Sequence, residues 1–145
     1  MITVFILASR SDERHITDFW IHLAMARRSH REVQWVSPLY VEDMLSTHAV
    51  VPALPQPYVV IGCLSKTFLS EVLDQPALRE LIGQAVRAIP LLIGSCEWNR
   101  FPSPFAQKMP LVPEIVNEQK SSDAVFSRAV GRLREALITT IETGK

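Results

Sequence analysis

The chain has 145 residues, of which 48% are hydrophobic and 21% are charged. This length and balance suit one folded domain, here residues 1–145, and exclude extended disorder. The chain has 15 Lys and Arg residues and 15 Asp and Glu residues, so no net charge draws it to nucleic acid or to anionic lipid. No apolar run approaches the roughly 20 residues of a membrane-spanning helix. We therefore expect neither a nucleic-acid partner nor a membrane partner.

The chain contains two cysteines and four histidines. Cys63 and Cys96 each stand at the end of an apolar run with β propensity, which is typical of buried, reduced thiols in a cytoplasmic protein. No histidine stands at a metal-ligand spacing from a cysteine. We expect no metal and no resident cofactor.

The first part of the chain predicts a strand, a helix and a second strand. Residues 2–8 form a continuous apolar run, as in a strand that is buried on both faces of a sheet. Hydroxyl and acidic residues that can cap a helix come next, and apolar residues at helical spacing then predict a helix over about residues 12–28. Residues 33–36 predict a second strand, which a Ser-Pro pair interrupts.

The middle of the chain continues this alternation. After a proline-rich connection, residues 58–64 predict a third strand that is apolar throughout. Pro76 suits the first turn of a helix, where a proline removes no helical hydrogen bond, and residues 88–95 predict a fourth strand. Because the strands at 2–8, 58–64 and 88–95 are the most apolar, we expect them to be central, with residues 33–36 nearer an edge.

The last third combines a long loop with the clearest helix. Residues 96–121 contain four prolines and several aromatic residues, and we expect Trp98 to hold this loop against the body. A short edge strand is an option at residues 114–116, and apolar residues repeat at helical spacing from Ser122 onward. This order predicts an α/β fold, a flavodoxin-like three-layer sandwich with a four- or five-stranded parallel sheet. Any ligand site is then expected at the carboxyl ends of the strands.

Two common classes of open α/β domain are excluded by their missing motifs. A dinucleotide-binding Rossmann unit needs a glycine-rich turn after its first strand, but residues 8–11 read Ala-Ser-Arg-Ser. With five glycines in all, the chain has no P-loop either. A response-regulator receiver needs an acceptor aspartate at the end of the third strand, where Ser65 stands instead.

Four short motifs carry a resemblance to a known family. They are Ser-Arg-Ser-Asp at 9–12, Leu-Ser-Lys-Thr-Phe-Leu-Ser at 64–70, Ile-Pro-Leu-Leu-Ile at 89–93 followed by Cys-Glu-Trp at 96–98, and Phe-Ala-Gln-Lys-Met-Pro at 105–110. In this order, and with a long last helix, they resemble the Toll/interleukin-1 receptor (TIR) domain family in its bacterial form. The resemblance covers nearly the whole chain.

The resemblance implies a TIR signalling module, in a setting such as bacterial immunity. Such a module acts by homotypic self-association or by binding a separate receptor or effector chain. The family's contact loop corresponds to residues 37–57, which lack the glycine that is common there. The alternative is an NAD glycohydrolase, in which NAD is the substrate and is cleaved to nicotinamide and an ADP-ribose product. A plain flavodoxin-like binding domain is a third interpretation.

In catalytic TIR domains a glutamate on the helix after the third strand attends the ribose of NAD. That position falls near Pro76 in this chain, so we take Glu80, about one helical turn further on, as the first candidate and Glu71 as the alternative. A carboxylate there could stabilise an oxocarbenium-like transition state. The nucleotide-binding candidates are Ser9, Arg10, Ser11, Trp35 and Ser65. As helix caps, solvated charges or core aromatics, these residues also have ordinary structural roles.

Overall fold

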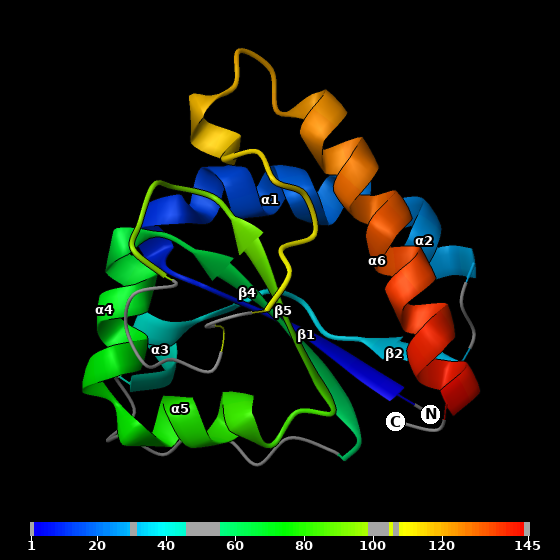
Figure 1. The fold of residues 1–145 in the computed structure, drawn as a ribbon, viewed down its shortest axis with the longest axis horizontal. Coiled ribbons are helices and arrows are strands. Elements are labelled where there is room, and N and C mark those ends of the chain that lie inside the picture. The colour runs from blue at the N-terminus through cyan, green and yellow to red at the C-terminus, as the bar shows by residue number, and fades with distance from the viewer. Residues whose placement is uncertain (1, 30–31, 46–55, 99–104, 106–107, 144–145) are drawn as a thin grey trace.

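The computed structural model of the chain describes residues 2–29, 32–45, 56–98, 105 and 108–143. They form an α/β fold around a five-stranded sheet in which every pairing is parallel (Figure 1). The strands are β1 (Ile2–Ala8), β2 (Val33–Trp35), β3 (Leu39–Tyr40), β4 (Tyr58–Leu64) and β5 (Arg87–Leu92). The order is β2-β1-β4-β5, with β3 also paired to β1. The expected flavodoxin-like, three-layer architecture is thereby confirmed.

The centre of the sheet is the pair formed by β1 and β4. All seven residues of each strand are buried, and their register runs from Thr3 opposite Tyr58 to Leu7 opposite Gly62. In a strand that is covered on both faces, no side chain can reach water, so polar residues are disfavoured at every position. Their unbroken apolar runs therefore predicted the central strands correctly.

The two edges of the sheet are occupied differently from each other. β2 and β3 pair with opposite ends of β1, on the same side of it, so the expected edge position of residues 33–36 is confirmed. β5 pairs with β4 at the other end of the strand order, and the expectation that residues 88–95 form a central strand is wrong. β5 is apolar because helices and the segment that follows it cover it, not because strands flank it on both sides.

The helices cover the sheet in two layers, and alternate strand residues point into each layer (Figure 1). In β4, Ile61 and Cys63 face one layer, whereas Val60 and Leu64 face the other. The first layer contains α1 (Glu13–His22), α2 (Ala24–Ser29) and α6 (Asp123–Thr143). The second contains α3 (Val41–Leu45), α4 (Lys66–Asp74) and α5 (Pro76–Gly83).

Two helices differ from the sequence prediction. The first predicted helix is divided at Leu23 into α1 and α2. α4, which was not predicted, begins directly after β4 and buries Phe68 and Val72. Gln75 has an extended backbone and separates α4 from α5, because the residue before a proline is biased away from helical geometry. No described helix is long and apolar enough to cross a membrane.

The segment after β5 wraps around the outer edge of that strand. The Leu111 N–H donates to the Pro90 carbonyl, and the Asn117 N–H donates to the Ile93 carbonyl, both at 2.9 Å. Phe105 lies in the α3–α5 layer, where the partly buried Trp98 also packs, whereas Leu111 lies in the α1–α6 layer. The optional edge strand at residues 114–116 is not formed, so that expectation is wrong. These residues form a bend and enter the short 3₁₀ helix η2 (Val116–Glu118).

Candidate functional site

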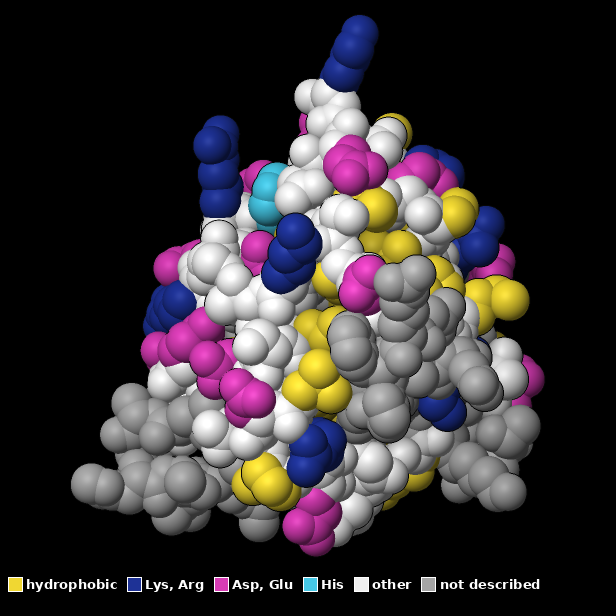
Figure 2. Space-filling model, turned by 60° about the vertical axis from the view of Figure 1, so that its left-hand side comes forward, with side chains coloured by type: hydrophobic (Ala, Val, Ile, Leu, Met, Phe, Trp, Pro, Cys, Tyr) yellow, Lys and Arg dark blue, Asp and Glu magenta, His cyan; other side chains and the backbone are white. Residues whose placement is uncertain are grey.

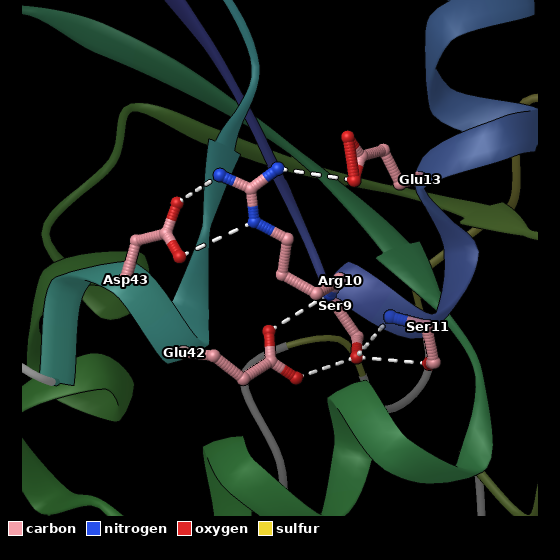
Figure 3. A network of polar contacts seen from close by, with 6 residues as sticks. All are labelled: Ser9, Arg10, Ser11, Glu13, Glu42 and Asp43. Carbon is pink, nitrogen blue, oxygen red and sulfur yellow. Dashed lines mark hydrogen bonds and ion pairs between the residues drawn. The ribbon is translucent and has the colours of Figure 1, made fainter.

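A polar cluster lies where β1, β3 and β4 end. Ser9 and the short 3₁₀ helix η1 (Arg10–Asp12) follow β1, Glu42 belongs to the helix α3 that follows β3, and Ser65 follows β4. Parallel strands bring such residues to one edge of a sheet. Figure 3 shows the side chains of η1 and α3 pointing toward one another at this edge.

Glu42 is held by two groups of the turn after β1 (Figure 3). The buried Ser9 hydroxyl donates to Glu42 Oε2 at 2.6 Å, and the backbone N–H of Arg10 donates to Glu42 Oε1 at 2.8 Å. Partial burial of Glu42 raises its pKa, but these two hydrogen bonds and one to its own backbone together outweigh the burial, so the pKa of Glu42 is lowered overall. The cluster therefore keeps Glu42 ionised.

The Arg10 side chain is neutralised by carboxylates of the same chain. Its guanidinium donates two hydrogen bonds to Asp43, one of them from Nε at 3.2 Å, and one to Glu13 at 3.1 Å. It also lies over the Tyr40 ring, 4.2 Å from the centroid. The bond to Asp43 raises the pKa of Arg10, and the same bond lowers the pKa of Asp43. The guanidinium of this nucleotide-binding candidate is thus already paired.

A hydrogen bond spans the crevice between β1 and β4. The Ser65 hydroxyl donates to Asp12 Oδ2 at 2.6 Å and accepts from the Phe68 N–H at 3.3 Å, which caps α4. The chain passes from β1 to β2 on one side and from β4 to β5 on the other, so this crevice is the switch point at which open α/β sheets bind ligands. Asp12 was expected to cap α1, but its side chain makes no cap bond there. It joins the two strand ends instead.

Trp35 does not lie at this edge. It pairs with Val4 in the middle of β1 and packs, partly buried, against the core of the α1–α6 layer. Its Nε1 is buried without a hydrogen-bond partner among the described residues. The structure therefore separates Trp35 from Ser9, Arg10, Ser11 and Ser65.

The two candidate glutamates are also apart from the cluster. Glu80 is exposed on α5, next to Leu81, whose carbonyl accepts a hydrogen bond from the Tyr58 hydroxyl. Tyr58 begins β4, so Glu80 lies near the amino ends of the strands, away from the carboxyl ends where a ligand site was expected. It is α4, not α5, that follows β4 directly. Glu71 lies on α4 and is partly exposed, and within the described residues no hydrogen bond or ion pair joins it to the cluster.

The sequence analysis missed the acidic pair Glu42 and Asp43. The sequence does show two adjacent acidic residues at positions 42 and 43. In the structure they follow a short strand that ends at the same edge as Arg10. That strand has only two residues, too few for a periodicity to identify, so the segment after it had no assigned place in the sheet.

A hollow of about 630 Å³ lies beside the cluster, between α4 and the residues that follow β5. Its polar lining mixes both signs of charge, with Lys66, Asp74 and Glu97 around the thiol-bearing Cys96. Burial raises the pKa of Cys96, which keeps it a thiol. Figure 2, in which the α4 side of the molecule comes forward, shows hydrophobic side chains in the middle of this face with charges of both signs around them.

Fold and site together define an open α/β domain in which the protein's own hydrogen bonds span the strand-end crevice. Comparison with protein-family models and with curated proteins gives no match to this chain. The likeness to TIR domains therefore rests on the sequence motifs.

Proposed function

We propose that this chain is a TIR-type signalling module that acts by associating with its own copies or with a partner chain. The observation that carries the proposal is the set of four hydrogen bonds by which Ser9 and Arg10 hold Glu42 and Asp43. They fix α3 and the preceding residues 37–40 in one orientation. A surface that is already ordered loses less conformational entropy when it binds.

The chemistry of residues 37–43 suits a protein partner. Leu39 and Tyr40 are partly exposed, and Asp43 and Arg10 beside them are exposed. Aromatic and arginine side chains with a charged rim are typical of protein interfaces. This stretch belongs to the contact surface expected from the TIR resemblance at residues 37–57, of which residues 46–55 lie outside the described residues.

Cleavage of NAD has less support from the geometry. It would need a carboxylate near the ribose at the strand ends, but Glu80 lies near the opposite end of β4. A nucleotide in the crevice would also have to displace the bond between Asp12 and Ser65. The cluster instead uses its polar groups to hold the chain together, which favours the binding role.

The proposal is tested by measuring self-association of the full chain, alone and fused to a tetrameric coiled coil. Tethering raises the effective concentration of the module, so weak contacts are populated. Light scattering at rising concentration should show association, and Asp43→Lys should weaken it by about tenfold or more, since the new charge repels Arg10 and changes the contact surface. Glu80→Lys, an equal change of charge on α5, is the control and should leave association intact.

The same samples are then incubated with NAD, and nicotinamide is separated by chromatography. A strict monomer in both forms, with no tethered assembly, would contradict the proposal. Nicotinamide release that Glu80→Gln abolishes would replace it with the enzymatic alternative. Circular dichroism of each variant must show a native fold before either result is read.

A further inference from the structure

A second hollow, distant from the strand-end cluster, lies along the outer edge of β5. It has a volume of about 460 Å³ and is bounded by the start of β5, residues 108–111 and one face of α6. We call it the edge groove. Val86 and Met109, which line it, are 39% and 83% exposed, so apolar surface faces water at its rim.

The floor of the edge groove is an unoccupied stretch of strand edge. Pro90 accepts a hydrogen bond on this side from Leu111, whereas Ile93 donates to Leu64 on the opposite side. Since backbone groups alternate along a strand, the N–H and C=O of Ala88 point to the same outer side as the C=O of Pro90. Within the described part of the chain, no backbone partner from outside the sheet reaches Ala88. Such an edge is a template for another strand.

The walls of the edge groove carry more positive than negative charge. Arg87, Lys108 and Arg132 line it together with a single carboxylate, Glu135. Arg87 donates to the Ala136 carbonyl of α6 at 3.3 Å, so its guanidinium is held on the α6 side. No ion pair is recorded for these three cations among the described residues.

We propose that the edge groove binds an extended acidic segment of a partner protein, which adds as a strand beside β5. Main-chain hydrogen bonds to Ala88 would supply affinity, and side-chain pockets would supply selectivity. In a strand, every second side chain points to the same face. Acidic residues at alternate positions would therefore all face Arg87 and Arg132, and the residues between them would face away. The inference does not depend on the association proposed for residues 37–43.

The test uses the full chain labelled with ¹⁵N and the capped hexapeptide Glu-Val-Glu-Val-Glu-Val. Titration should shift the amide signals of Ala88, Met109 and the facing residues of α6. Arg132→Glu should weaken binding by about tenfold or more, and Glu135→Gln should strengthen it. Arg134→Glu, the same charge reversal on α6 but outside the groove lining, should have little effect. Rising salt should weaken binding, because the charges are exposed.

Further peptides separate strand addition from simple charge attraction. Glu-Glu-Glu-Val-Val-Val has the same composition but places acidic residues on both faces, and it should bind at least several-fold more weakly. Two N-methylated forms of the alternating peptide, each methylated on the nitrogens of one edge, cannot donate from that edge, and the methyl groups keep it from approaching β5; binding should be weakened at least several-fold in one form and kept in the other.

Three results would overturn the inference. The first is the absence of shifts around Ala88 at millimolar peptide. The second is equal binding by inorganic phosphate or by the block peptide, which would make the groove an anion site. The third is self-association that Arg132→Glu abolishes and the peptide does not compete with, which would assign the groove to a second copy. Failure of the Asp43→Lys experiment bears on none of these.

Discussion

The strand-end cluster shows how single residues decide between binding a ligand and holding the fold. Ser9 is fully buried, yet its hydroxyl is satisfied by Glu42 and Ser11. A buried hydroxyl without a partner would cost about 1–3 kcal/mol. The bonds to Glu42 and Asp43 and the bond between Ser65 and Asp12 join different elements of the chain, so these polar atoms stabilise the junction of β1 with α3 and α4.

Replacement of Glu42 by Gln should therefore make stability depend less on pH. The pKa of Glu42 is lowered in the folded state, so its stabilising contribution is present above the ordinary glutamate pKa and is lost as the pH falls through the folded value. Because Glu42 is only partly buried, we expect Glu42→Gln to lower the free energy of unfolding by about 1 kcal/mol at pH 7. The difference should shrink as the pH falls below the ordinary value.

Urea denaturation of both proteins at pH 7 and at steps down to pH 3 measures this effect. Glu80→Gln is the matched control, since it makes the same change at an exposed position on α5 and should leave the curve unchanged. A loss of stability that is equal at all pH values would show that Glu42 contributes by shape and not by charge.

The residues of the site could be predicted only in part. Ser9, Arg10, Ser11 and Ser65 were expected at strand ends and lie there, because a buried apolar run locates the end of its strand well. Whether those residues were free to bind a ligand depended on Glu42 and Asp43, which lie more than 30 positions further along the chain from Ser9 and Arg10. Contacts between residues so far apart in the sequence depend on tertiary packing, and the periodicity of apolar residues gives no information about them.

At the scale of elements, the segment after β5 replaces a further strand. Phe105 is fully buried and lies against Gly62 of β4, where an added Cβ would come within 2.2 Å of its ring. Phe68 of α4 lies on the same ring, 6.2 Å between centroids. Glycine is thus required at position 62 because an aromatic ring occupies the space that a side chain would need.

The Gly62→Ala variant should lose about 1–3 kcal/mol of unfolding free energy, since the ring or the strand must move. Chemical denaturation measures this loss. Gly131→Ala is the control, because a Cβ added at that position in α6 would meet no atom within 4 Å apart from its chain neighbours and the backbone of its own helix, and it should raise stability by up to about 1 kcal/mol. Gly62→Ala combined with Phe105→Ala should be no less stable than Phe105→Ala alone. Additive losses would show that the two residues do not meet.

Elements with a long, regular pattern were predicted well, and those decided by their neighbours were not. α6, β1 and β4 follow directly from their apolar spacing. α4 was missed because the second predicted helix was placed only from Pro76 onward, although Ser65 supplied a cap before it. The edge position of β5 could not be read from its composition, because a covering loop and two layers of helices bury a strand as fully as flanking strands do.

For the whole molecule, the order of the strands determines where the two candidate surfaces lie and which strands are the most protected. The polar cluster lies at the carboxyl ends of β1, β3 and β4, and the edge groove lies on the outer side of β5 near its start. These two surfaces belong to different sides of one sheet, so one copy of the chain could engage two partners at once.

Native-state hydrogen exchange should reveal this order of strands directly. Amides of β1 and β4 are buried on both faces and have strands on both sides, so they should exchange only through global unfolding. Amides of the three-residue β2, which pairs only with the start of β1, should open at a lower free energy. Exchange in low concentrations of urea distinguishes the two cases, because only the global process exposes enough surface to respond strongly to denaturant.

If the β2 amides exchange as slowly as those of β4 at low protein concentration, β2 is not an open edge of the isolated chain. If they slow only as the concentration rises, a second copy covers that edge, next to the surface proposed for association.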